Sequence, residues 1–474
     1  MQTVAVVGGG ISGLAAAYRL VTSGQDVRVL VLEASDHLGG IVRTEHVDGF
    51  TIDGGPDSFL LMKPRGIGLA RELGLEDRLQ WTNEANRGSF LYRKGALHPL
   101  PEGLTGLIPT KLAPMVKTPL VSPRGKARMA LDFVLPSRKG DGDESLRAFI
   151  SRRLGPEVFD NLIEPLMAGI YSGDGSQLSL AATFPQLRAA EKEHGGLIKG
   201  VLAGRKQQTM RAVGHQTRQG FVSFRTGMHE LPDALKTAIE THGGVIKTRR
   251  RVTRIDQMDD GRFVVAQDGE NRAWSDLFDK VILAAPVCVQ AGLLQYLDAE
   301  AAHAMAEIPV ASSAAVLLGY RETGEVIAPR DYGYLVPRVE QRPIKAITWL
   351  SSKWEDRAPE GHFLVRAFIG RVGQQEVLQH SDDELVGLVR QELREVSAIS
   401  GDPVVQRVYR LNEAMPQYTV GHLERVARLE AALERVPGLE IAGNMLRGVG
   451  IPDIIAAGES AADRLLGRQD PVSS

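Results

Sequence analysis

Three glycines near the start of the chain have the spacing of a dinucleotide-binding turn. Gly8, Gly10 and Gly13 follow the β-branched run Thr3–Val7, which predicts a buried strand, and they open a predicted helix from Ile11 to about Val21. The first glycine permits a tight turn, the second lets the backbone approach a pyrophosphate, and the third lets helix and strand pack closely.

The groups that would hold the dinucleotide surround this turn. The free N–H groups of the helix start, at Ile11 and Ser12, and the positive end of the helix dipole favour a pyrophosphate. Glu33, followed by Ala34, ends a second apolar run, Val27–Leu32, and its carboxylate can accept hydrogen bonds from a ribose diol. NAD and FAD share this fingerprint, so the turn alone does not choose between them.

A second glycine pair favours FAD. Gly39 and Gly40 lie six residues past Glu33 and are followed by Arg43. A glycine pair and an arginine there would let the chain pass close to the flavin's own phosphate. The alternative is an ordinary surface loop, because glycine is common in turns.

The segment Arg447–Asp453 near the other end of the chain is predicted to complete the flavin site. Pro452 fits the start of a helix, since its missing N–H would be unpaired there anyway. The N-terminus of that helix would stabilise the negative charge that a reduced flavin develops at its N1–O2 edge. An ordinary C-terminal capping helix is the alternative. The backbone positions expected to contact the cofactor here are Gly443, Val449, Gly450 and Ile451.

The composition excludes several classes of protein. The chain has 474 residues, 43% of them hydrophobic, which suggests two or three domains, and its net charge of −2 argues against nucleic-acid binding. The single cysteine, Cys288, excludes an internal disulfide framework and is typical of a reducing cytosol; its apolar surroundings predict a buried, inert thiol. The longest apolar runs are too short to span a bilayer, the first strand starts too early to leave room for a signal peptide, and no metal site is predicted.

Three separated segments are predicted to share one nucleotide-binding domain: residues 1–53, about 220–288 and 428–474. In the second, Val252 could offer its backbone to adenine, although a plain core valine is an equal alternative. Between the last two, the strands expected at Ala314–Tyr320, Ile344–Leu350 and Phe363–Ile369 and a helix at Asp382–Ser397 predict a mixed, mostly antiparallel sheet.

The middle of the chain is predicted to be mostly helical. Helices are expected near residues 124–135, 145–154 and 157–166, with Ser145 as an N-cap. Residues 111–139 carry seven Lys or Arg against one Asp, which indicates a membrane-surface or partner-docking face, or merely a solvated basic face. Residues 203–220 are polar and weakly patterned, which predicts a loop.

Taken together, these residues resemble the HemY-type protoporphyrinogen and coproporphyrinogen oxidases of the glutathione-reductase-like FAD superfamily. The fingerprints at Gly8–Gly13 and Glu33–Ser35 are shared across that superfamily. Narrower blocks are more specific, and they resemble most the Gram-positive branch that forms coproporphyrin; they are Gly54–Leu60, Asn161–Asp174, Leu178–Pro185, Met415–Tyr418 with Gly421-His422, and Gly448–Asp453.

The resemblance implies an α/β fold, α+β overall, with a Rossmann-like FAD-binding domain of glutathione-reductase type, a mixed-sheet substrate domain and a mostly helical domain. The implied FAD-binding domain comprises residues 1–53, 220–288 and 428–474. The substrate domain comprises residues 54–92, 201–219 and 289–427, and the helical domain residues 93–200.

The implied activity is the FAD-dependent oxidation of coproporphyrinogen III to coproporphyrin III in haem biosynthesis, with O₂ as acceptor and hydrogen peroxide as by-product. A meso carbon between two pyrroles would lose hydride to flavin N5, in about three rounds, and the protein would supply orientation and a dry slot. No side chain is assigned a certain catalytic role.

The resemblance also implies further site residues. The block Gly54, Gly55, Pro56 and Asp57 would contact FAD, and Lys63, Arg366 and Phe368 would contact the substrate. Phe368 stands where the branch has tyrosine, which favours packing on the macrocycle over a polar role. For Lys63 and Arg366 the alternative is a surface or structural ion pair, and for Arg205 and Arg211 a solvated loop is favoured over propionate binding.

Three other functions stay open at this point: oxidation of protoporphyrinogen IX, an amine oxidase or carotenoid desaturase activity, and a non-redox protein such as a prenyl-protein escort. The expected partners are a tetrapyrrole substrate and O₂. A cytoplasmic location is expected, with contact to the inner face of the membrane or docking to ferrochelatase as hypotheses, while the oligomeric state is not predicted.

Overall fold

A five-stranded parallel sheet combines three segments that are far apart in the sequence. Its strands, in spatial order, are β12 (Val245–Lys247), β2 (Val27–Leu32), β1 (Gln2–Val7), β16 (Lys280–Leu283) and β22 (Leu439–Ile441). The computed structural model describes residues 1–86, 88–102, 104–105, 108–109, 112–200, 202–203, 220–268, 273–323 and 326–468.

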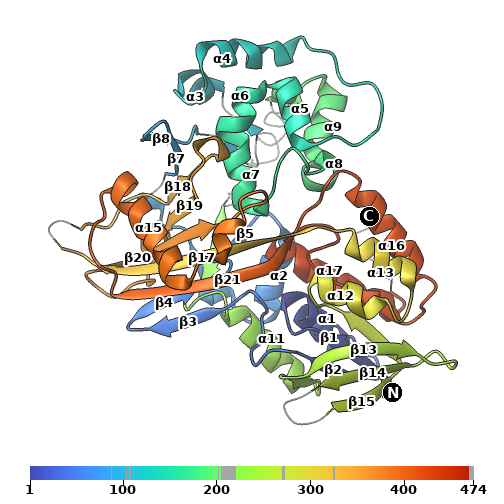
Figure 1. Cartoon of the computed structure of the whole chain (residues 1–474). Helices are drawn as coiled ribbons and strands as arrows, with labels where there is room; N and C mark the ends of the chain where they lie inside the picture. Colours follow the sequence, from blue (N-terminus) through green and yellow to red (C-terminus); the bar gives the residue numbers. More distant parts are fainter. Residues whose placement is uncertain are drawn as a thin grey trace.

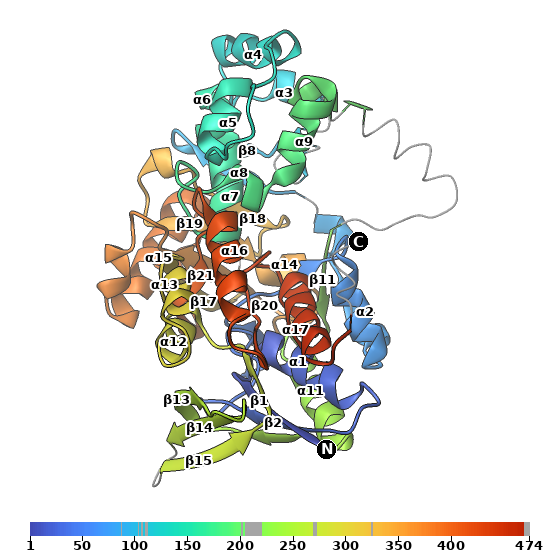
Figure 2. The same ribbon diagram turned by 90° about the vertical axis from the view of Figure 1, so that its right-hand side faces the viewer.

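Alternate residues of β1 face two different cores, as the period of a strand requires. Val4 and Val6 pack under three helices: α1 (Ile11–Val21), α11 (Glu230–Thr241) and α17 (Ile451–Leu465). Ala5 and Val7 pack against the antiparallel strands β13 (Arg251–Gln257), β14 (Phe263–Asp268) and β15 (Ala273–Phe278), and α12 (Val287–Leu294), α13 (Ala299–Ala306) and α16 (His422–Leu433) complete that core. Figures 1 and 2 both show α1, α11 and α17 side by side.

A second, seven-stranded sheet forms the other large layer (Figure 1). Its order is β21 (Val405–Pro416), β17 (Val310–Arg321), β20 (His362–Ile369), β19 (Ile344–Trp349), β18 (Gly333–Leu335), β7 (Phe90–Arg93) and β8 (Ala96–Pro99). All neighbours are antiparallel except β18 and β7. Helix α15 (Asp382–Ser397), which begins with a capping box at Ser381 and Glu384, covers one face.

The helical part stands at one end of the molecule (Figures 1 and 2). It contains α3 (Leu112–Lys117), α4 (Pro123–Ala130), α5 (Leu146–Arg153), α6 (Pro156–Val158), α7 (Glu164–Tyr171), α8 (Leu180–Thr183) and α9 (Pro185–His194). The helix expected at 157–166 is interrupted by a π-helical turn over Phe159–Ile163. The predicted cap of α5 is confirmed, because the Ser145 hydroxyl accepts from the Ala148 N–H at 3.2 Å.

Short elements connect these layers. Strands β3 (Thr44–Val47) and β4 (Phe50–Asp53) form a hairpin. Strands β5 (Phe59–Leu60), β11 (Phe221–Phe224) and β6 (Leu79–Trp81) form a three-stranded sheet. In the sequence, these strands lie between strands of the two large sheets. Helices α2 (Pro64–Glu72) and α14 (Leu350–Lys353), the strand pair β9 (Leu104–Thr105) and β10 (Ile108–Pro109), and the single turns at Glu76–Arg78, Glu84–Asn86, Leu131–Phe133, Arg338–Glu340 and Glu376–Gln379 complete the described elements.

The predicted fold class is confirmed, while the exact domain boundaries stay a prediction. The expectation for Cys288 was wrong: the residue is exposed in the first turn of α12, whose neighbour Val287 faces the core instead. Partial burial and a hydrogen bond to Glu413 raise the pKa of this thiol. None of the described helices is both long enough and apolar enough to cross a bilayer.

Candidate active site

The first glycine turn leaves open space at the start of α1. A Cβ on Gly8, whose φ is +113°, would come within 2.5 Å of the Ala284 carbonyl oxygen, and one on Gly13 within 2.0 Å of the Gly8 carbonyl oxygen. A Cβ on Gly10 would meet nothing within 4 Å. The outer glycines are therefore required by the protein's own packing, and only Gly10 faces room for a ligand.

The start of α1 has the donors that an anionic ligand needs. Its N-cap, Gly10, supplies no side-chain hydrogen bond to the first turn, so the dipole and free N–H groups stay uncompensated there. The side chain of Ser12 is buried, and its hydroxyl is without a partner in the described part of the chain. An unpaired buried hydroxyl beside an open helix N-terminus fits a pyrophosphate, whose oxygens would accept from both.

The Glu33 carboxylate accepts hydrogen bonds from the glycine turn and from Ser35. Its Oε2 accepts from the Gly9 N–H, and its Oε1 accepts from the N–H and the hydroxyl of Ser35, each at 2.7 Å. The neighbouring Ala34 is exposed. The contact of Glu33 with a ribose stays a prediction, but the structure shows that this carboxylate also fixes the conformation of the glycine turn.

The structure brings the second glycine pair and the block after β4 to the same place. The Gly39 N–H donates to the Gly9 carbonyl at 2.8 Å, and Gly40 approaches Gly10. A Cβ on Gly55 would lie 2.0 Å from the Ile41 carbonyl oxygen, and the Arg43 carbonyl accepts from the Gly54 N–H at 2.9 Å. Segments predicted separately to hold FAD therefore lie next to one another.

Helix α17, from the other end of the chain, packs beside the glycine turn of α1. A Cβ on Gly458 would lie 2.1 Å from the Ser12 carbonyl oxygen, so α17 packs directly against the start of α1. At the start of α17, the Asp453 carboxylate accepts from the Gly450 N–H at 3.1 Å, and Lys63 donates to both of its oxygens at 2.5 and 2.6 Å. Lys63 therefore forms an ion pair, which was the alternative to substrate binding. The sequence did not identify its partner, Asp453.

Arg366 and Asp57 belong to one buried ionic cluster. Asp57 accepts from Arg366 Nη2 at 2.8 Å, from Lys353 Nζ at 2.9 Å and from Trp354 Nε1 at 2.7 Å. Burial raises the pKa of the Asp57 carboxyl, but the charges of Arg366 and Lys353 and the hydrogen bonds hold it well below its ordinary range. Arg366 also donates to the Gly55 carbonyl, and its Nε has no partner among the described residues.

Two cations lie close to the ring of Phe368, namely Arg366 from the same face of β20 and Lys345 from β19. Arg366 Cζ is 4.6 Å and Lys345 Nζ is 5.4 Å from the centre of its ring. Lys345 reaches this face because the β19–β20 register shifts between Ile344 and Ala346, and a bulge of this kind re-aims a side chain. The aromatic position was found from the resemblance, but nothing in the sequence marks the bulge that brings Lys345 to it.

Lys345 is buried and lacks a carboxylate partner in the described part of the chain. Its ammonium donates to the Gly370 carbonyl at 3.0 Å and to the Ser172 hydroxyl. Burial, and then the charge of Arg371, lower its pKa to about 7. A small increase in surrounding negative charge, such as a carboxylate of a ligand, would favour the charged form.

The remaining predicted positions are less informative. Val252 lies in the core under β1, at a bulge in β13, and Gly443 follows β22 with a φ of +145°. Arg205 and Arg211 lie outside the described residues. No group of three or more described His, Cys, Asp or Glu side chains could hold a metal ion.

The comparisons with known proteins agree with this geometry. Residues 11–466 match the family of flavin containing amine oxidoreductases. Over 98% of its length the chain is 36% identical to the coproporphyrinogen III oxidase of Bacillus subtilis (97% of that protein) and 34% identical to that of Staphylococcus aureus (99%). The crystal structure of a candidate protoporphyrinogen oxidase from Exiguobacterium sp. 255-15 superposes with a TM-score of 0.85 at 32% identity, over 99% of both chains.

The fold and the site therefore define an FAD-dependent oxidoreductase. The chain belongs to the flavin containing amine oxidoreductase family, and the predicted resemblance to the porphyrinogen oxidases is confirmed. FAD is the cofactor, and when bound it supplies the hydride acceptor. The individual contacts of the residues described above with FAD and substrate stay predictions.

Filling the open space at Gly10 tests the cofactor site. We expect Gly10→Ala to keep the fold, because its φ of −71° suits alanine and its Cβ meets no protein atom. FAD binding should weaken about tenfold or more, since the methyl group occupies the space where a pyrophosphate meets the backbone. The measurement is flavin absorbance per protein after gel filtration, together with the unfolding midpoint.

Gly387→Ala is the matched control, because a Cβ on this exposed glycine of α15 also meets nothing within 4 Å. Full flavin content in both variants would contradict the placement of the pyrophosphate at Gly10.

Proposed function

We propose that this protein oxidises coproporphyrinogen III to coproporphyrin III, using FAD and O₂ and releasing hydrogen peroxide. The observation that carries the proposal is the ring of Phe368 close to the cations of Arg366 and Lys345. A pyrrole ring of the tetrapyrrole can pack on this phenyl ring while its acidic substituents meet the cations. The full-length relatives from Bacillus and Staphylococcus, which are named for this reaction, support the same substrate.

In this proposal the residues of the chain bind and orient. Phe368 gives an apolar surface for one face of the tetrapyrrole. The Asp57 cluster fixes Arg366 beside it, so that little side-chain freedom is lost when the substrate binds. Lys63 neutralises Asp453 at the start of α17. It thereby limits the negative charge at the place where a reduced flavin would itself become negatively charged. The hydride and the oxygen chemistry belong to the cofactor.

A direct comparison of substrates tests the proposal. Flavin-loaded protein is given coproporphyrinogen III or protoporphyrinogen IX in air, and the initial rise of porphyrin fluorescence is measured. We expect the rate at low substrate to be at least about tenfold higher with coproporphyrinogen III, because each added carboxylate that meets a buried cation contributes a charge-assisted hydrogen bond. Equal rates, or a preference for protoporphyrinogen IX, would contradict the proposed substrate.

The same sample separates the other functions. Oxidation of an amine or a polyene, with no porphyrin formed from either porphyrinogen, would indicate an amine oxidase or desaturase. A colourless protein that takes up no FAD would indicate a non-redox protein on this fold.

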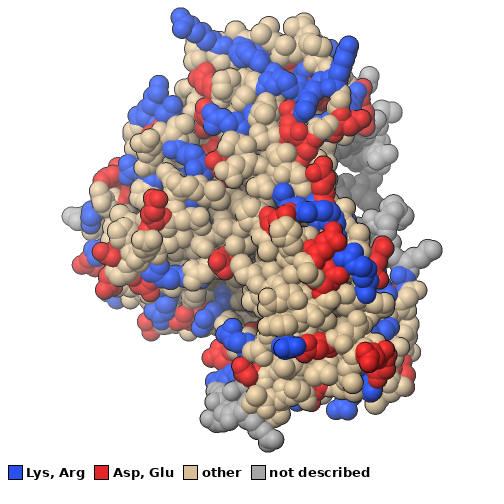
Figure 3. All heavy atoms as spheres, turned by 45° about the vertical axis from the view of Figure 1, so that its right-hand side comes forward, with Lys and Arg blue, Asp and Glu red and all other residues tan. Residues whose placement is uncertain are grey.

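We also propose that the helical end of the molecule touches an anionic membrane surface. Val116, Leu131, Phe133 and Val134 are exposed there by 61%, 46%, 38% and 77%. Lys and Arg side chains gather over the same end (Figure 3). Exposed apolar side chains among cations suit a lipid surface with negative headgroups. Docking of a ferrochelatase stays a hypothesis without a surface assigned to it.

Vesicle sedimentation tests the membrane contact. We expect the protein to pellet with vesicles containing phosphatidylglycerol but not with pure phosphatidylcholine vesicles, and binding should fall in high salt. The variant Phe133→Ser with Val134→Ser should lose most of the binding. Equal recovery in the supernatant with both kinds of vesicle would refute the contact.

A further inference from the structure

The block Met415–Tyr418 and the pair Gly421-His422 have no role in the site described so far. They connect the end of β21 to the start of α16, and neither touches Phe368 or the glycine turn of α1 in the described contacts. Both side chains Tyr418 and His422 are fully buried. Buried polar side chains at such a junction require partners, and these partners show what the block does.

Tyr418 bonds the flavin turn at two points. Its hydroxyl donates to the Asn444 carbonyl at 2.5 Å and accepts from the Gly448 N–H at 2.8 Å. A phenolic oxygen can serve as donor and acceptor at once, so one atom joins both sides of the turn. Gly448 has a φ of +109°, and a Cβ there would lie 2.5 Å from the Asp453 carboxyl carbon, so the turn has little freedom of its own.

His422 bonds the same turn at a third point. Its ring stacks on the ring of Tyr418, with centres 4.0 Å apart and planes 13° apart. Its Nε2 lies 3.0 Å from the Leu446 carbonyl oxygen, which can only accept, so Nε2 carries the proton. Burial, together with the charges of Arg425 and Arg447 and opposed in part by this hydrogen bond, lowers its pKa to about 4. The imidazole is therefore neutral near pH 7.

The helical part and α16 hydrogen-bond the segment that carries Tyr418 and His422. The Ser179 N–H donates to the Tyr418 carbonyl at 2.7 Å, and the Val420 N–H donates to the Gln177 carbonyl at 2.9 Å. Arg425 donates to the Thr419 carbonyl at 3.0 Å. These contacts join the helical part, residues 418–420 and α16 at one point.

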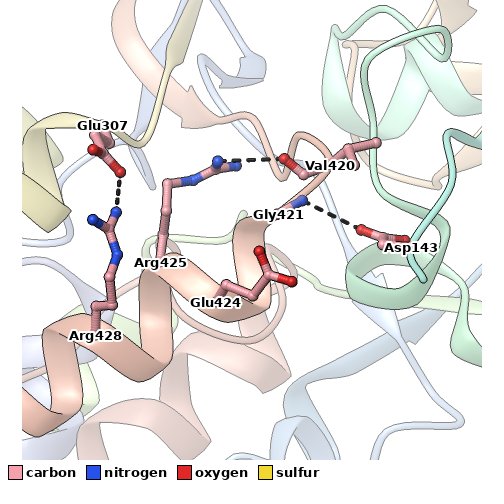
Figure 4. Close-up of a pocket in the computed structure, with 7 residues that line it drawn as sticks. All are labelled: Asp143, Glu307, Val420, Gly421, Glu424, Arg425 and Arg428. Carbon is pink, nitrogen blue, oxygen red and sulfur yellow. Dashed lines mark hydrogen bonds and ion pairs between the residues drawn. The ribbon is translucent and has the colours of Figure 1, made fainter. Parts of the chain in front are cut away.

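A surface pocket of about 510 Å³ lies over this junction (Figure 4). In it, the Gly421 N–H donates to Asp143 Oδ2 at 3.4 Å, Arg425 also donates to the Val420 carbonyl at 3.3 Å, and Arg428 pairs with Glu307. Two charged groups of the pocket, Asp143 and Arg425, are thus hydrogen-bonded to the segment that carries Tyr418 and His422.

We propose that Tyr418 and His422 act as one unit, the Tyr418–His422 clamp, that positions residues 443–450 and the N-terminus of α17 for FAD. The clamp fixes three backbone groups within five residues, at Asn444, Leu446 and Gly448. The helix end that follows would face the electron-rich edge of the reduced flavin, where a small displacement weakens a directed dipole strongly. Both residues are positioning residues, because their side chains bond the turn. The inference rests on FAD as cofactor and not on which porphyrinogen is oxidised.

Two substitutions test the clamp. Tyr418→Phe keeps the stacked ring and removes only the hydroxyl, and His422→Phe keeps a ring and removes only the bond to Leu446. We expect each substitution to weaken FAD binding by about tenfold, because one or two buried hydrogen bonds are lost. The measurement is a titration of the apoprotein with FAD, followed by the quenching of flavin fluorescence. The increase in melting temperature on adding FAD should shrink in both.

The readouts distinguish positioning from general stability. Tyr320→Phe is the control. Tyr320 in β17 is also buried, its ring stacks on that of Phe363 in β20, and it lies in a different core. The double variant Tyr418→Phe with His422→Phe should bind FAD only slightly more weakly than either single variant, since both act through one turn. If Tyr418→Phe does not fold, the FAD titration of His422→Phe decides alone.

A lower melting temperature of the apoprotein with unchanged FAD affinity and an unchanged FAD-induced shift would overturn the proposal. Because all of these measurements are made without substrate, their outcome is independent of the comparison of the two porphyrinogens.

Discussion

Asp57→Asn is expected to destabilise the protein by about 3–5 kcal/mol, because it leaves two buried cations without their shared anion. Arg366 and Lys353 both donate to Asp57, and the exposed fractions of the three side chains are 4%, 13% and 9%. An asparagine keeps one acceptor but directs an amide N–H at a cation on its other side. Against a total stability of about 5–15 kcal/mol, this loss shifts the unfolding midpoint greatly or prevents folding.

The measurement is the midpoint of chemical unfolding followed by circular dichroism. Asp256→Asn is the control, since its pair with Arg254 is exposed on β13 and should leave the midpoint unchanged. Adding Lys353→Met to Asp57→Asn removes one of the two unpaired cations and should recover part of the loss. A midpoint for Asp57→Asn equal to that of Asp256→Asn would show that the cluster is not what stabilises this junction.

The features that depend on local spacing were predictable from the sequence. The glycine turn, the two strands that flank it and Glu33 lie within one βαβ unit, in which the backbone geometry leaves few alternatives. The strands β17, β19 and β20 and the helix α15 were also expected close to their observed bounds, because their apolar patterns have the periods of 2.0 and 3.6 residues.

The partners of the site residues could not be predicted, because they are far apart in the chain. Asp57 meets Arg366 across 309 positions, and Lys63 meets Asp453 across 390. Hydrophobic period and turn chemistry carry no information on such pairs. Lys63 and Arg366 were identified only through the family resemblance, which left Asp453 without a role and assigned Asp57 to the cofactor.

Irregular backbone explains the other omissions. Lys345 faces Phe368 only because of a bulge, and a bulge shifts which side of a sheet a residue lies on. Cys288 was expected to be buried because its neighbours are apolar, but the chain turns from strand to helix at Pro286 and changes which neighbours face the core. A pattern of residue types does not show where such a change of period begins.

The stability of the protein is expected to fall as the pH decreases from about 6.5 to about 4, and His422 should account for a large part of this. The pKa of His422 is about 4 in the folded protein against an ordinary value of 6.5. Between these two values the unfolded chain binds a proton that the native protein excludes, so lowering the pH favours unfolding. A difference of about 2.5 pKa units corresponds to about 3 kcal/mol, fully lost near pH 4.

The charges near His422 act in the same direction. Arg425 on α16 and Arg447 in the flavin turn both oppose a positive imidazole, while Tyr418, stacked on it, is neutral throughout this range. The Nδ1 atom is buried and has no partner among the described residues, so a proton there would be unsatisfied. Protonation therefore strains the clamp that holds residues 443–450, and FAD should be released over the same range of pH.

The experiment compares the free energy of unfolding of the wild type and His422→Phe at intervals from pH 7.5 to pH 4. His422→Phe should be less stable at pH 7.5, because it lacks the bond to Leu446, but its stability should fall less with pH, so that the two curves converge toward pH 4. Taking the difference between the curves removes the contributions of the other histidines and of the carboxylates, which both proteins share. Parallel curves would mean that His422 titrates normally and that acid acts on the flavin turn through other groups.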